Sequence, residues 1–106
     1  MISKELLSEV LKINVISVEI EDNGIHICAY RDGVHTEFTC NIYELAHKCK
    51  SWALDKNQSL TSWAFKTDNA FCEIGSREDS DYSFFEANTE QEAIFKACEW
   101  ILKGMK

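Results

Sequence analysis

The chain of 106 residues contains no proline, only four glycines and no pair of cysteines at C-x-x-C spacing. The absence of proline leaves every strand free to donate its full set of ladder hydrogen bonds. Four glycines are too few for a glycine-rich phosphate loop, and neither a G-x-S-x-G elbow nor an H-E-x-x-H zinc motif occurs. The sequence therefore predicts a protein that is not an enzyme and has no cofactor.

Long hydrophobic runs are also absent. No segment approaches the roughly 20 apolar residues that a transmembrane helix requires. The first six residues, MISKEL, have neither the basic region nor the apolar region of a signal peptide. We expect a cytoplasmic protein with no membrane contact.

Basic residues are scarce, since 11 lysines and arginines face 18 aspartates and glutamates, for a net charge of −7. A protein that binds nucleic acid directly needs basic groups to neutralise phosphates. Direct nucleic-acid binding is therefore not expected, whereas a basic protein would be a suitable partner. The alternative is that the negative charge only keeps a small protein in solution.

The five cysteines are odd in number and lie inside apolar segments, as is typical of free thiols in a reducing compartment. Metal-ligand pairs usually lie two to four residues apart. The sequence therefore predicts no metal site among these residues: Cys28, Cys40, Cys49, Cys72 and Cys98.

His26 and Cys28 stand two apart on one expected strand and thus share a face, which invites comparison with a Cys-His nucleophile. Their Cα atoms would be about 7 Å apart, too far for a direct hydrogen bond between the side chains. A catalytic pair would need His35 or His47 close by. We therefore predict no catalytic residue.

Periodicity predicts three helices and six strands in the order α-βββ-α-βββ-α. Capping residues and apolar stripes indicate helices at 3–12, 41–54 and 89–103. Alternation indicates strands at 15–20, 25–30, 34–40, 60–66, 70–75 and 82–87, the first with Ile16, Val18 and Ile20 on one face. The expected fold class is α+β, a single domain over 1–106 with an antiparallel sheet of about six strands covered by helices. The alternative is that the two three-stranded meanders form separate sheets.

The second and third helices correspond at an offset of 48 residues, which pairs Glu44 with Glu92 and Trp52 with Trp100. This favours an internal duplication, with pseudo-repeat halves 1–54 and 41–104 that share the middle helix. Each half would place a tryptophan-bearing helix over its strands. The alternative is that two well-capped amphipathic helices converge on the same spacing.

The most polar stretch, 76–81, lacks the D-x-D-x-D-G spacing of a calcium loop. Its carboxylates form either a solvated loop or a charged interaction surface. The candidate surface comprises Glu78, Asp79, Asp81 and Trp63.

Aromatic residues also contribute to the predicted interaction surface. Trp63 shares a strand face with Phe65, while Tyr43 and Phe95 lie towards the edges of their helical stripes. An aromatic rim beside acidic groups suits protein binding. The alternative is that these rings close the edge of the core.

Residues 41–102 carry the phrases AHKCKSWA and ANTEQEAIFKACEWIL. In these phrases the chain resembles small uncharacterised phage and prophage proteins of the phage α-β-α sandwich domain type. The resemblance implies a phage-derived gene and brings no catalytic or binding residues with it.

These observations together lead to a functional expectation. We expect a non-enzymatic accessory protein that acts through protein contacts, for example by inhibiting a host defence factor. The alternatives are an immunity or antitoxin-like protein that neutralises a toxic enzyme, and a small cysteine-dependent enzyme. An unpaired edge strand would also permit a homodimer.

Overall fold

The computed structural model describes residues 2–22, 24–76 and 82–105 and confirms the α+β class and the predicted order of elements. The helices are α1 (Lys4–Leu11), α2 (Ile42–Asp55) and α3 (Glu90–Gly104). The strands are β1 (Asn14–Glu21), β2 (Gly24–Arg31), β3 (Val34–Asn41), β4 (Gln58–Lys66), β5 (Asn69–Ser76) and β6 (Tyr82–Ala87).

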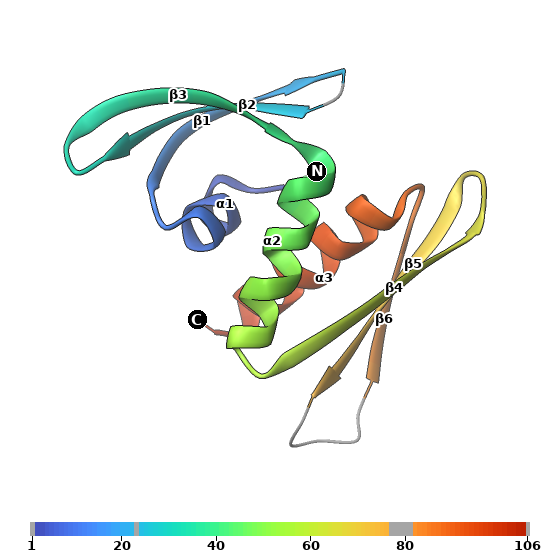
Figure 1. Ribbon diagram of the computed structural model, residues 1–106. Coiled ribbons are helices and arrows are strands. Elements are labelled where there is room, and N and C mark those ends of the chain that lie inside the picture. Colours follow the sequence, from blue (N-terminus) through green and yellow to red (C-terminus); the bar gives the residue numbers. More distant parts are fainter. Residues whose placement is uncertain (1, 23, 77–81, 106) are drawn as a thin grey trace.

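The strands form two separate three-stranded antiparallel sheets, β1-β2-β3 and β4-β5-β6, rather than the expected single sheet of about six strands. We call them the first sheet and the second sheet. Helix α2 connects β3 to β4 and carries the chain across the helical layer. The second sheet therefore forms on the other side of the helices, as Figure 1 shows. The first sheet packs mainly on α1, and the second on α2 and α3.

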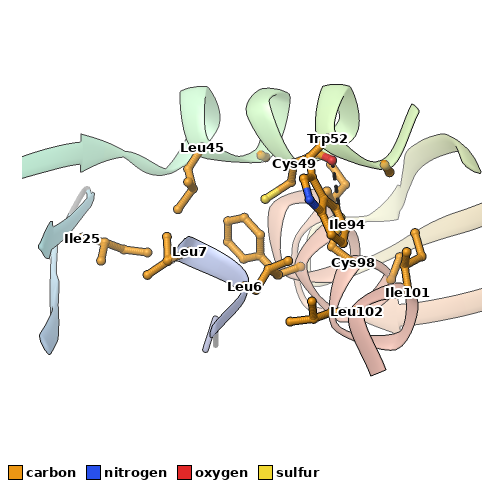
Figure 2. Close-up of a cluster of buried hydrophobic side chains, with 14 of the residues drawn as sticks. Leu6, Leu7, Ile25, Leu45, Cys49, Trp52, Ile94, Cys98, Ile101 and Leu102 are labelled. Carbon is orange, nitrogen blue, oxygen red and sulfur yellow. Dashed lines mark hydrogen bonds between the residues drawn. The ribbon is translucent and has the colours of Figure 1, made fainter. Parts of the chain in front are cut away.

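One hydrophobic core joins the two sheets through the helices. Leu6 and Leu7 of α1 are fully buried, and Leu7 points toward Ile25 of β2 (Figure 2). Leu6 points toward the side chains of α3, so this short helix connects the first sheet to the long helices. The apolar stripes predicted for α2 and α3 supply the rest of the core.

Each helix begins directly after the capping residue that the sequence indicates. The side chains of Ser3, Asn41 and Thr89 accept hydrogen bonds from backbone N–H groups in the first turns of α1, α2 and α3. These bonds satisfy donors that have no partner within the helix. Asp32 and Gly33, with φ of 53° and 79°, form the predicted turn between β2 and β3.

Strand β1 contains a β-bulge between Val15 and Ser17, which the sequence did not predict and which changes the face on which Ile16 lies. Because the bulge adds one residue, Val15 lies in the core at 7% exposure while Ile16 is 41% exposed. After the bulge, Val18 and Ile20 face Ile27 and Ile25 across the β1-β2 pair. Strict alternation therefore assigns Ile16 to the wrong face.

The two matched tryptophans occupy different environments. Trp52 is 6% exposed, whereas Trp100 is 51% exposed and contacts Phe85 at 6.1 Å between ring centroids. The matched positions therefore differ in burial, although α3 covers the second sheet as predicted. Duplication of the two halves remains a prediction. Among the described helices, none has the length and apolar composition needed to cross a membrane.

Candidate functional site: an aromatic face on the second sheet

Alternation along the second sheet separates an inner face from a solvent-facing one. On the inner face Ala70, Cys72 and Ile74 of β5 are buried against the helices. The alternate residues therefore point away from the core. Four rings gather there, and we call them the aromatic face: Trp63, Phe65, Phe71 and Phe84.

The rings of the aromatic face contact one another but remain open to solvent. Trp63 stacks on Phe71 at 5.6 Å between centroids and meets Phe84 edge-on at 6.3 Å. Phe65 meets Phe71 edge-on at 6.4 Å. Exposure is 36% for Trp63, 67% for Phe65 and 60% for Phe84. The cluster is ordered by ring-ring contacts without being covered by other parts of the described chain.

Carboxylates lie between these rings. Strand pairing places Glu73 of β5 beside Phe84 of β6, and Glu86 of β6 beside Phe71 of β5. Both glutamates thus share the outer face with the aromatic side chains. The face is apolar at its ring surfaces and negatively charged between them.

One cation already lies over a ring of this surface. Lys66 Nζ is 5.7 Å from the centroid of the Phe65 ring. That distance is within the range of a cation–π contact. The Phe65 ring therefore already makes one cation–π contact on this surface.

Of the four residues predicted from sequence, the structure describes one. Trp63 lies on an exposed face with Phe65, whereas Glu78, Asp79 and Asp81 lie outside the described residues. Phe71 and Phe84 belong to the cluster but were not identified as site residues. Alternation within the expected strands 70–75 and 82–87 gives each ring a face, but only strand pairing shows that this is the face that carries Trp63.

The two helical aromatics that were predicted at stripe edges differ. Tyr43 is 65% exposed, but Phe95 is fully buried in the core. The prediction of an edge position is wrong for Phe95, because α3 packs against the second sheet and also against α1 and α2. The buried stripe of α3 is therefore wider than a stripe that covers the second sheet alone.

A separate, polar cluster lies on the outer face of the first sheet. Glu37 Oε1 accepts hydrogen bonds from His26 Nε2 at 3.1 Å and from Cys28 Sγ at 3.5 Å. Pairing of Cys28 with Glu37 across β2 and β3 brings these donors together. The glutamate therefore links two side chains that strand geometry alone keeps apart.

Electrostatics in this cluster follow from that pairing. The hydrogen bond to Glu37 raises the pKa of His26 above 6.5, and the carboxylates of Glu19 and Glu21 add to the effect. The same bond lowers the pKa of Glu37 below 4.5. Both groups are solvent-exposed, so solvent screens the interaction.

The buried thiols are poorly suited to nucleophilic chemistry. Burial raises the pKa of Cys72 to about 12. The hydrogen bond of Cys98 to Cys49, drawn in Figure 2, and burial together raise the pKa of Cys98. Thiols in such surroundings are protonated at neutral pH, and the thiolate is the reactive form.

Comparisons with known proteins identify no relative. No family model, no curated protein and no solved structure matches the chain.

Proposed function

We propose that this chain is a non-enzymatic binding protein whose aromatic face engages a partner protein with a basic surface. The observation that carries the proposal is the four-ring cluster on the solvent side of the second sheet. Aromatic residues are enriched in the energetically dominant centres of protein interfaces. The rings supply apolar area at low entropy cost, since each has few rotatable bonds.

The chemistry of the partner follows from the charges between the rings. Glu73 and Glu86 would pair with arginine or lysine side chains, which the ring faces also attract. The position of Lys66 over Phe65 supports this geometry. Because complementary charge speeds association and disfavours wrong partners, a basic surface is the best match.

Self-association through the same face is disfavoured. An interface between two copies there would contain Glu73 and Glu86 of both chains, four carboxylates in all. Each chain also carries a net charge of −7. Like charges across an interface are destabilising, so we take the occupant to be a different protein.

The phage or prophage origin suggested by sequence gives the partner a biological class. We take it to be a host defence factor, because proteins that handle nucleic acid present the basic grooves that an acidic, aromatic surface would occupy. A toxic enzyme neutralised in an immunity-like complex is the alternative. Its gene would lie beside that of this chain, which distinguishes the two.

Site-specific crosslinking tests the proposal. A photoreactive p-benzoylphenylalanine replaces Phe65 in one sample and Tyr43 in the other, two positions of similar exposure at 67% and 65%. Both proteins are irradiated in lysate of the organism that encodes the chain. We expect one protein to be crosslinked from position 65 and not from position 43.

The crosslinked protein is then purified and titrated with the wild-type chain and with a Glu73→Gln, Glu86→Gln double variant. We expect saturable one-to-one binding that weakens with salt, and further weakening in the double variant. Equal crosslinking from both positions, or binding that is indifferent to the two carboxylates, would contradict the proposal.

A further inference from the structure

We propose that His26, Cys28 and Glu37 form a zinc-binding site on the outer face of the first sheet. Their candidate ligand atoms, one from each side chain, all lie within 4.8 Å of one another. The three residues come from two paired strands, which hold their backbones in fixed register.

The distances within the cluster are close to those around a zinc ion. Zinc–nitrogen bonds of about 2.0 Å and zinc–sulfur bonds of about 2.3 Å put tetrahedral donors roughly 3.3–3.6 Å apart. Glu37 Oε1 lies 3.1 Å from His26 Nε2 and 3.5 Å from Cys28 Sγ. Small side-chain rotations would therefore complete three corners of a tetrahedron around one ion.

The surroundings of His26 supply a second, independent feature of metal sites. Its other ring nitrogen, Nδ1, lies 3.4 Å from Thr39 Oγ1 and 4.0 Å from a carboxylate oxygen of Glu21. With Nε2 on the ion, Nδ1 carries the proton and donates a hydrogen bond to Thr39 Oγ1, while the Glu21 carboxylate lies nearby. Such outer partners fix the tautomer and orient the ring of a ligating histidine.

The donor set favours zinc over magnesium and calcium. One thiolate, one imidazole and one carboxylate make a mixed sulfur, nitrogen and oxygen set, whereas magnesium and calcium prefer oxygen alone. The carboxylates of Glu19 and Glu21 add negative potential at His26. Three protein ligands leave a fourth position for water, and the exposure of the site gives water access: the side chains of His26 and Glu37 are 29% and 53% exposed.

Sequence spacing could not identify this site. His26 and Cys28 alone are two ligands on one strand, and Glu37 lies beyond the β2-β3 turn. Pairing across the sheet supplies the third ligand. The expectation of no metal site rested on spacing along the chain and did not include such pairing.

Cobalt(II) is the probe that tests the proposal, because a cobalt–thiolate bond has a near-ultraviolet charge-transfer band and four-coordinate cobalt absorbs strongly in the visible. The reduced, metal-free chain is titrated with Co²⁺ and then with Zn²⁺. We expect both bands to saturate at one equivalent and to disappear as Zn²⁺ displaces Co²⁺.

Variants assign the ligands. Cys28→Ser removes the charge-transfer band, and His26→Gln and Glu37→Gln each weaken zinc binding by more than the roughly 10- to 100-fold that loss of an outer partner costs. Matched controls are Cys40→Ser, a half-buried thiol packed against the core, and His47→Gln on α2. Both controls should bind as the wild type does.

Three results would overturn the site: no thiolate band at one equivalent of Co²⁺, an undiminished band in Cys28→Ser, or equal losses in the two controls. Far-ultraviolet circular dichroism verifies that each variant is folded. The site and the aromatic face are on different sheets, so the outcome is independent of the crosslinking experiment.

Discussion

Phe84 and Phe95 offer a direct comparison between an exposed ring of the aromatic face and a ring of the core. Phe95 is fully buried, so Phe95→Ala removes its burial and leaves a cavity. Such truncations cost about 3–5 kcal/mol. The expected loss is therefore a large share of the total free energy of unfolding of a small domain.

For Phe84 the loss is much smaller. The residue is 60% exposed, so only two-fifths of its surface is removed from water. If a phenylalanine offers about 200 Å², that fraction corresponds to about 80 Å² and to at most about 2 kcal/mol. No enclosed cavity forms, because the truncated site opens to solvent. We expect Phe84→Ala to cost about 1–2 kcal/mol.

Urea unfolding followed by circular dichroism measures both values. If the free energy of unfolding falls with urea concentration at the same slope in all three proteins, the two variants unfold as the wild type does. A loss of 3 kcal/mol or more in Phe84→Ala would refute the reasoning, because it would make the ring part of the structural core. A loss that also grew with protein concentration would identify burial between two copies.

Three further substitutions test the structure locally. Gly24→Ala would place a Cβ 2.5 Å from the backbone oxygen of Cys40. We therefore expect the variant to be about 1–3 kcal/mol less stable in urea unfolding. An unchanged urea midpoint would contradict this close approach. Thr89→Ala removes the hydroxyl that accepts the third N–H of α3, and it should cost about 0.5–2 kcal/mol in thermal or urea unfolding, whereas no loss would mean that the cap is dispensable. In the metal-free chain, His26→Gln should reduce stability most between pH 4.5 and 6.5. Protonated His26 contributes below 6.5 and this contribution is lost as pH rises through its raised pKa, while ionised Glu37 contributes above 4.5 and is lost as pH falls through its lowered pKa. A difference between wild type and variant that does not vary with pH would contradict the pairing.

Local structure was predictable because its causes are local. Asn41 and Thr89 have the side chains that cap helices, and Asp32-Gly33 has the chemistry of a tight hairpin turn. Every predicted strand end lies within two residues of the observed end. The order of helices and strands could therefore be derived from spacing and capping alone.

Features that depend on contacts across the fold were not predictable. Whether two meanders join depends on which side of the helices the second one packs, and strand periodicity does not encode that choice. The bulge after Val15 inserts one extra residue into β1 and thereby turns Ile16 to the opposite face of the sheet. The edge position predicted for Phe95 follows from the stripe of one helix, but its burial depends on how α3 packs against other elements.

The candidate sites show the same division. Alternation in β4 put Trp63 and Phe65 on one face, but only strand pairing adds Phe71 and Phe84 to them. Likewise, Glu37 of β3 joins His26 and Cys28 of β2 only because the two strands pair. Sequence reasoning gives the side chains available on each strand, and the register determines which of them meet.

The affinity of the purified partner for a Phe65→Ser, Phe84→Ser double variant tests the central claim most directly. The matched control is Tyr43→Ser, which removes a ring of similar exposure from α2. Loss of interface anchors costs at least about 2 kcal/mol, so we predict at least a roughly 30-fold higher Kd for the double variant and no change for the control. Wild-type affinity in the double variant, or an equal loss in the control, would contradict a binding role for the aromatic face.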